Sequence, residues 1–252
     1  MSTQSQLNLT KLDLRKQIVL DLTKRKGLEH QKAQVALVLD HSGSMSELYR
    51  NGTVQDTLER IVPIAMQFDD NSEFELFLFE NSCYRHKNNV TIQNCANIVD
   101  REIDGKYPWG GTAYAPVIKQ IMDFYIPSRK SSKAAGFLSK LFGATPKDET
   151  LKLSTPVYVI FITDGENSDH AATQEMIREA SNYGIFFQFV GIGSERFSFL
   201  EKLDTLSGRF IDNAGFFKIK NLARISDDDL YDSLLSEFPS WLNLAKSKNL
   251  IG

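Results

Sequence analysis

Cysteine is scarce in this chain, with Cys83 and Cys95 the two cysteines among 252 residues. They lie too far apart for a Cys-x-x-Cys motif and are too few for the disulfide framework of a small secreted domain, so we expect both to be reduced.

The sequence also lacks long apolar runs. No segment reaches the roughly 20 apolar residues that cross a bilayer, and the start lacks the basic and apolar segments of a signal peptide. We therefore expect a cytoplasmic protein without stable membrane insertion.

A strong excess of one charge is also absent. The chain has 29 basic and 32 acidic residues and a formal net charge of -3, whereas a nucleic-acid binder needs a clustered basic face for phosphate contacts. We therefore expect no nucleic-acid partner. The glycine-rich run of phosphate-binding loops and the nucleophile elbow of serine hydrolases are missing as well. Nucleotide hydrolysis and serine-dependent hydrolysis are not expected either.

What the chain does contain is an alternation of strand and helix patterns. Continuous apolar runs, typical of strands covered on both faces, and one alternating segment predict strands at 35–39, 73–79, 157–162, 185–190 and 216–219. Apolar residues at helical spacing predict helices at 54–68, 115–125, 171–183 and 198–206. A polar stretch at 81–92 predicts a short edge hairpin, and 94–103 a brief helix.

This alternation predicts the fold class. Repeated strand–helix units with short connections give a mostly parallel sheet with right-handed crossovers. We expect a doubly wound, Rossmann-like α/β fold. Its sheet would have six strands, with one short antiparallel edge strand, and helices would cover both faces.

We divide the chain into an N-terminal helical extension, residues 1–33, and one α/β domain, residues 34–252. Within the domain, residues 226–252 form C-terminal helices. Residues 127–155 carry scattered lysines among serine, alanine and glycine in a connection longer than usual, which indicates a flexible basic insertion. A short basic amphipathic helix around Lys140, suited to an anionic partner or a membrane surface, is the alternative for that insertion.

Three separated motifs carry oxygen-bearing side chains at or near the carboxyl ends of predicted elements. They are Asp40-His41-Ser42-Gly43-Ser44, Gly110-Gly111-Thr112 and Thr163-Asp164-Gly165. The loops that follow neighbouring central strands of a doubly wound sheet face one crevice, so these motifs can converge there. The candidate ligands are two carboxylates and three hydroxyls: Asp40, Ser42, Ser44, Thr112 and Asp164. Hard oxygen donors favour one divalent cation, Mg²⁺ first and Mn²⁺ or Ca²⁺ next, over Zn²⁺.

Together these motifs resemble the metal-ion-dependent adhesion site of von Willebrand factor A (vWA) domains. The resemblance implies that Ser42, Ser44 and Thr112 coordinate the cation, whereas Asp40 and Asp164 act directly or through waters. It also implies that a carboxylate of a protein partner completes the coordination. The expected function is therefore cation-dependent protein binding without catalysis.

Three further segments narrow the resemblance. Residues 33–40, 48–55 and 234–241 are similar to the TerF-like branch of vWA domains, which is associated with tellurium resistance, and copines are more distant relatives. This similarity implies a bacterial, cytoplasmic scaffold in a tellurium-resistance or related stress-response system.

Several residues flank the motifs without belonging to the ligand set. Trp109, Glu166 and Asn167 are candidates for a rim that contacts the partner. His41 lies at a variable position of its motif, and we exclude it from the site. Asp169 is expected to cap a helix. Gly111 and Gly165 are expected to permit a close approach of the backbone.

An enzyme is the alternative function. An aspartate at the end of the first strand, with Mg²⁺, is also the arrangement of phosphatases and phosphotransferases that form an aspartyl phosphate. Asp40 would then be the nucleophile. That chemistry usually needs a second carboxylate two residues later as acid and base, and Ser42 occupies this position instead.

Overall fold

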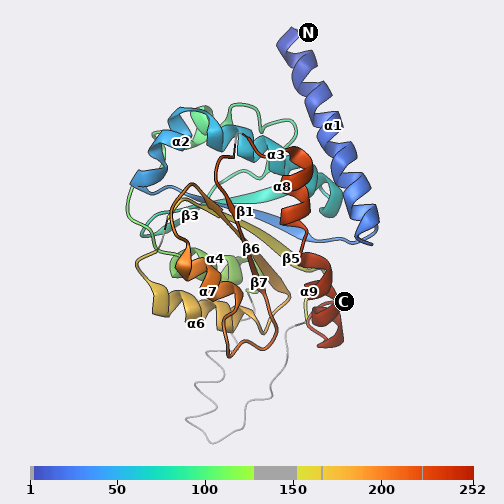
Figure 1. Cartoon of the computed structure of the whole chain (residues 1–252), viewed down its shortest axis with the longest axis vertical. Coiled ribbons are helices and arrows are strands. Elements are labelled where there is room, and N and C mark those ends of the chain that lie inside the picture. Colours follow the sequence, from blue (N-terminus) through green and yellow to red (C-terminus); the bar gives the residue numbers. More distant parts are fainter. Residues whose placement is uncertain (1–2, 128–151, 166, 223) are drawn as a thin grey trace, which may run out of the picture.

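The computed structural model describes residues 3–127, 152–165, 167–222 and 224–252, and within these ranges seven strands form one mixed sheet (Figure 1). The strands are β1 (Gln34–Asp40), β2 (Glu73–Phe79), β3 (Cys83–Arg85), β4 (Val90–Thr91), β5 (Val157–Thr163), β6 (Ile185–Ile192) and β7 (Ala214–Ile219). Their order is β3-β2-β1-β5-β6-β7, with β4 also paired to β2. The pairs β2–β1, β1–β5, β5–β6 and β6–β7 are all parallel. The predicted doubly wound α/β fold is confirmed.

The antiparallel edge of the sheet is interrupted. β3 pairs with residues 77–79 of β2, and β4 pairs with residues 73–74 of the same strand. The two segments therefore follow one another along one edge of β2, as a single edge strand broken into two pieces. This explains why the sheet has seven strands where six were predicted. The predicted hairpin at 81–92 is wrong, because both segments pair with β2.

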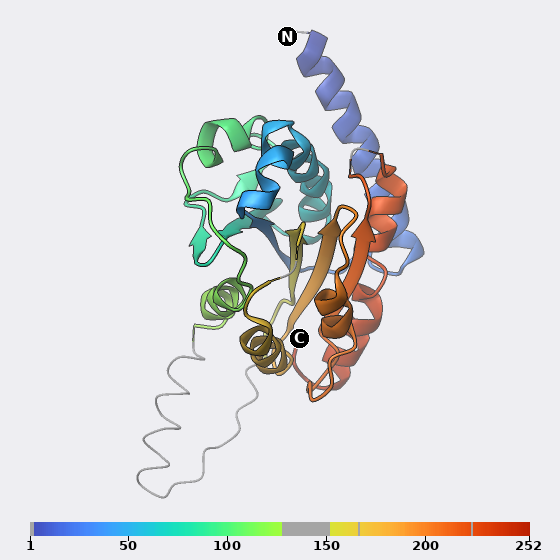
Figure 2. The ribbon, with the colours of Figure 1, turned by 60° about the vertical axis from the view of Figure 1, so that its left-hand side comes forward.

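Helices cover both faces of the sheet (Figures 1 and 2). They are α1 (Thr3–Arg25), η1 (Gly43–Met45), α2 (Ser46–Arg50), α3 (Thr53–Phe68), the π-helical η2 (Val99–Ile103), α4 (Ala115–Tyr125), α6 (His170–Ala180), α7 (Ser198–Asp204), α8 (Asp227–Leu234) and α9 (Phe238–Ser247). Buried residues of α1, α3, α8 and α9 form one core cluster, on one face. Those of α4, α6 and α7 form a second cluster, on the other face.

The two clusters explain the apolar runs of the central strands. Leu37 and Leu39 of β1 belong to the cluster under α3, whereas Ala36 and Val38 belong to the cluster over α4. Successive side chains of a strand point to opposite faces, so a strand covered on both sides is apolar at every position. The hydrophobic cores on the two faces fix the sheet, and with it the loops at its carboxyl edge.

Helix α1 packs on the same core as the domain. Val19 and Leu22 are 1% and 4% exposed and join the cluster that contains α3. Arg15 bonds to Asp227 of α8 at 3.1 Å and to Asp56 of α3 at 3.3 Å. Helix α1 is therefore attached to the domain through both apolar and ionic contacts.

Two further expectations concern the insertion and the absence of membrane-spanning helices. The predicted insertion at 127–155, with the alternative helix around Lys140, lies almost entirely outside the described residues. Among the helices that the structure describes, none is long and apolar enough to cross a membrane.

Candidate metal site

The candidate site lies where the order of the sheet reverses. From β1 the chain goes on to β2 on one side, and β5 joins β1 on the other side. Loops that leave two such strands diverge and open a crevice at their carboxyl ends. Asp40 ends β1 and Thr163 ends β5. The first and third motifs therefore start side by side, although they are more than a hundred residues apart in sequence.

Asp40 is completely buried at the base of this crevice. Its Oδ1 accepts a hydrogen bond from the Ser42 backbone N–H at 2.8 Å, and its Oδ2 accepts one from the Thr163 hydroxyl at 2.6 Å. Burial raises the pKa of Asp40 to about 6, although these hydrogen bonds act in the opposite direction. A nearby positive charge would stabilise the charged carboxylate.

A chain of side-chain contacts runs from Ser42 to Asp164. The hydroxyls of Ser42 and Ser44 are 3.1 Å apart, and Ser44 donates to Oδ1 of Asp164 at 2.8 Å. Burial raises the pKa of Asp164, and the hydrogen bond from Ser44 lowers it. Together with the bond from Ser42 to Asp40, these contacts join four of the five predicted ligands into one cluster.

The loop of Thr112 lies against both other motifs. The backbone N–H of Gly43 donates to the carbonyl of Gly110 at 3.0 Å. On the other side, the backbone N–H and the hydroxyl of Ser168 donate to the carbonyl of Thr112 at 2.9 and 3.0 Å. Thr112 itself is half-buried. All three motifs therefore meet at one place, with the loop of Thr112 connected to the other two through its backbone.

Close packing accounts for the two glycines of the second motif. A Cβ atom on Gly110 would lie 2.2 Å from Oε2 of Glu80, and one on Gly111 would lie 2.6 Å from Oδ1 of Asn81. The expected close approach is therefore present at Gly111. At Gly165 it is not, since no atom lies within 4 Å of the position that a Cβ would take.

Asp169 holds the second and third motifs together, a role that the sequence did not reveal. Its two carboxylate oxygens accept hydrogen bonds from the backbone N–H groups of Tyr114, at 3.0 Å, and Ala115, at 2.8 Å. Asp169 thus caps α4, whereas its side chain makes no capping bond to α6, the helix that follows it. The capping aspartate was expected, but the helix that it caps comes from a distant part of the chain.

The residues predicted to flank the site differ in exposure. Trp109 is 39% exposed and stacks on His41, with the ring centroids 3.9 Å apart. His41 is buried, and its Nδ1 lies 2.8 Å from the carbonyl of Pro108. Asn167 is 5% exposed and donates to Asp169 at 2.6 Å, so its side chain supports the loop from inside. Glu166 lies outside the described residues.

The chemistry of the clustered groups fits a hard divalent cation. Their donors are carboxylate and hydroxyl oxygens, the ligand type that Mg²⁺, Mn²⁺ and Ca²⁺ prefer. Within the described part of the chain, no group of three or more histidine, cysteine, aspartate or glutamate side chains gathers as a metal site. Hydroxyls would therefore have to complete the coordination that Asp40 and Asp164 begin.

Comparisons with known proteins identify the family of the chain. A family model described as "vWA found in TerF C terminus" matches residues 32–142 and 143–251. The protein YcbR of Bacillus subtilis (strain 168) is 39% identical over 243 residues, which cover 95% of this chain and 90% of that protein.

Solved structures show the same fold at low identity. BatB from Bacteroides thetaiotaomicron has a TM-score of 0.52 and 15% identity, covering 84% of this chain and 99% of that one. The manganese-loaded TRAP protein of Plasmodium vivax has a TM-score of 0.50 and 14% identity, over 83% and 74% of the two chains. Proximal thread matrix protein 1 from the mussel byssus has a TM-score of 0.52 and 15% identity over 81% of this chain, which spans 47% of that protein's length. With its family match over most of its length, the chain belongs to the vWA-TerF-like family, the vWA domains found in the C terminus of TerF.

Proposed function

We propose that this chain is a non-enzymatic binding module that holds one divalent cation, Mg²⁺ in the cell, and uses it to capture an acidic group of a protein partner. The cation would be held by Asp40, Ser42, Ser44, Thr112 and Asp164. When bound, it supplies a positive charge and a free coordination position for the partner's carboxylate.

The observation that carries this proposal is the buried Asp40 joined to Asp164 through the two serines. A carboxylate without exposure to water is unfavourable unless it is neutralised or paired. Asp40 accepts hydrogen bonds but has no ion pair in the described residues, so its charge is available for a cation. The serine hydroxyls, which can turn to offer their lone pairs, lie between the two carboxylates.

The chain's own residues would prepare the site before any partner arrives. Thr163 and the backbone of Ser42 hold the Asp40 carboxylate in one orientation, while Asp169 and Asn167 hold the loops of Thr112 and Asp164 together. Such preorganisation reduces the ordering cost of binding. Trp109, which is partly exposed beside His41, would contact the partner at the rim. Glu166 remains a rim candidate by its position in the sequence.

For the cellular role, the proposal rests on membership of the family. A TerF-like vWA domain would act as a scaffold in a bacterial tellurium-resistance or related stress-response system, in the cytoplasm. The manganese-loaded state of one structural relative supports the choice of a divalent cation.

The test is capture of proteins from a bacterial lysate by the immobilised chain, with Mg²⁺ or with a chelator. The variants are Asp40→Asn and, as a control, Asp21→Asn on the exposed side of α1. Retention that needs both Mg²⁺ and Asp40, and that survives Asp21→Asn, supports the proposal. Retention that the chelator does not change contradicts the proposal.

A parallel assay with a generic phosphate ester tests the enzyme alternative. Turnover that Asp40→Asn abolishes would overturn the binding-module assignment.

A further inference from the structure

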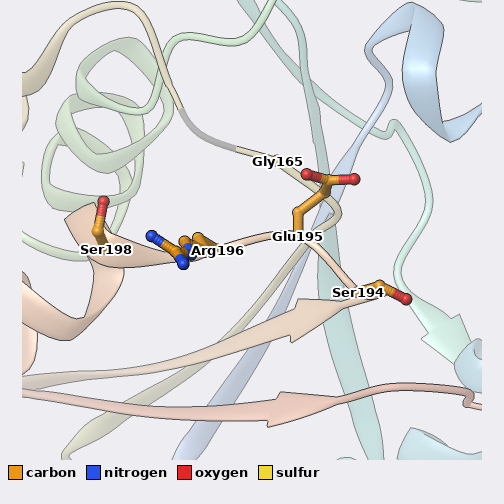
Figure 3. Close-up of a pocket in the computed structure, with 5 residues that line it drawn as sticks. All are labelled: Gly165, Ser194, Glu195, Arg196 and Ser198. Carbon is orange, nitrogen blue, oxygen red and sulfur yellow. The ribbon is translucent and has the colours of Figure 1, made fainter.

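A hollow of about 660 Å³ opens beside the candidate metal site (Figure 3). It is lined by Gly165, Ser194, Glu195, Arg196 and Ser198. Gly165 directly follows Asp164, one of the candidate ligands. The hollow and the candidate cation position are therefore neighbours.

The backbone around the hollow is firmly anchored. The amino group of Lys218 on β7 donates to the carbonyls of Ser194, at 3.1 Å, and Glu195, at 2.5 Å. Phe197 is 2% exposed and packs against Gly191, where a Cβ would lie 2.9 Å from its ring. The loop between β6 and α7 thus has a fixed position from which its side chains project.

Two side chains on this loop carry opposite charges and have no hydrogen bond or ion pair in the described part of the chain. Glu195 and Arg196 are both exposed. In Figure 3 they point away from each other, the carboxylate toward Gly165 and the guanidinium toward Ser198. A fixed backbone that presents two unpaired, opposite charges into one hollow is a surface suited to charge-complementary binding.

The charge balance of the site indicates which partner fits. A bound divalent cation would balance Asp40 and Asp164, and among the described residues that line the hollow the remaining charges are then Glu195, negative at one side, and Arg196, positive at the other. A partner that brought one carboxylate alone would add negative charge beside Glu195. A basic group next to that carboxylate would offset the repulsion, and a second acidic group would match Arg196.

We propose that this hollow is the second half of the partner-binding surface and that it selects a protein segment of mixed charge. In that segment the acidic residue that reaches the cation is accompanied by a basic side chain for Glu195 and an acidic side chain for Arg196. This inference rests on the function proposed above. Exposed ion pairs are weak, so each contact is expected to change affinity by no more than about fivefold and to weaken as salt is added.

The test uses a synthetic library of nine-residue peptides with a fixed central glutamate and random flanking residues. The immobilised chain is loaded with Mn²⁺, washed, and eluted with a chelator, and the eluted peptides are sequenced. For the wild type we expect Lys or Arg to be enriched at some flanking positions and Asp or Glu at others. Glu195→Gln should remove the basic preference, and Arg196→Gln the acidic one. Glu201→Gln, an exposed glutamate on α7 outside the hollow, should keep both.

The outcomes separate the two proposals. Peptides that elute with the chelator but show no charge preference, or a preference that survives both variants, overturn the role of the hollow and leave the cation site standing. If the wild type retains no peptide in a chelator-sensitive way, the proposed function itself fails, and the role of the hollow fails with it.

Discussion

Glu80 illustrates how a single residue outside the motifs shapes the candidate site. It is 6% exposed, and its carboxylate accepts hydrogen bonds from the backbone of Asn81 and Ser82 and from the hydroxyl of Tyr84. This network fixes the carboxylate against the backbone of Gly110. The loop that carries Thr112 therefore has its position set by a residue that is not itself a candidate ligand.

Replacing Gly110 with alanine tests this packing. The new Cβ would lie 2.2 Å from Oε2 of Glu80, and that carboxylate cannot move away without losing its hydrogen bonds. We expect Gly110→Ala to lower the free energy of unfolding by about 1–3 kcal/mol, the usual cost of overpacking. Gly165→Ala, where no atom is within 4 Å of the new Cβ, should change it by less than about 0.5 kcal/mol. Equal losses in the two variants on urea denaturation would contradict the packing argument.

The candidate ligands could be selected from the sequence, but the residues that hold their loops in place could not. Asp40, Ser42, Ser44, Thr112 and Asp164 stand in short motifs whose residue types suit a cation. Glu80 and Asp169, in contrast, act on segments that lie 30 and 54 residues away in the chain, at Gly110 and Ala115. Such pairings depend on how the loops pack, and no local pattern reveals them.

Between elements, Asp169 connects the start of α6 to the start of α4. Alanine at this position would leave the backbone N–H groups of Tyr114 and Ala115 without their acceptor. We expect Asp169→Ala to cost about 1–2 kcal/mol, as for other lost helix caps. The same variant should weaken Mn²⁺ binding in calorimetry, since the loop of Thr112 would no longer be held. Asp169→Asn keeps one acceptor oxygen and should lose less. Full Mn²⁺ affinity in Asp169→Ala would show that the cap does not support the site.

Asp227 connects three helices in a similar way. Arg60 of α3 donates to it at 2.6 Å and Arg15 of α1 at 3.1 Å. Arg60 is 3% exposed, and removing its partner would leave a buried charge without an ion pair. We expect Asp227→Ala to lower the free energy of unfolding by about 2–3 kcal/mol, less than for a fully buried pair because Asp227 is partly exposed. The exposed neighbour Asp228→Ala is the control. A loss equal to that of the control would argue against this junction.

The elements that the sequence predicted best are those with a strong apolar period. Residues 115–125 form α4 with the predicted bounds, and the strands at β1, β2, β5 and β6 lie within two residues of the predicted ones. The edge segment at 81–92 was predicted wrongly because it is polar and carries no pattern that decides its partner. Both of its short strands pair instead with the edge of β2 that β1 leaves free.

For the whole molecule, the doubly wound topology was predictable because strand and helix patterns alternate throughout. The strand order reverses at β1, which has β2 on one side and β5 on the other, and this brings three distant motifs together.

The same packing also partly buries polar side chains that belong to none of these motifs. Glu237, just before α9, packs on β7, where a Cβ on Gly215 would lie 2.7 Å from its Oε1. Partial burial and the charges of Asp204 and Asp212 raise the pKa of Glu237 to about 7, although Arg209 lowers it.

This shift predicts how stability depends on pH. The pKa of Glu237 is near 4.5 in the unfolded chain and about 7 in the folded one. Between these values the folded state binds more protons, so the contribution of Glu237 to stability falls as the pH rises through this window. After allowance for partial exposure, we expect Glu237→Gln to be about 1–2 kcal/mol more stable than the wild type at pH 8, and equal near pH 4.5. Urea denaturation across this range, with Glu201→Gln as control, measures it. A gain that does not change with pH would contradict the assignment.

The most direct test of the cation site is a crystal structure of the chain grown with Mn²⁺, with data collected at the manganese absorption edge. We predict one anomalous peak at the carboxyl end of β1 and β5, within roughly 2.0–2.6 Å of ligand oxygens from the set Asp40, Ser42, Ser44, Thr112 and Asp164. The hydroxyls of Ser42, Ser44 and Thr112 should be among them. A manganese peak elsewhere with this crevice empty, or Thr112 turned away from the ion, would contradict the account.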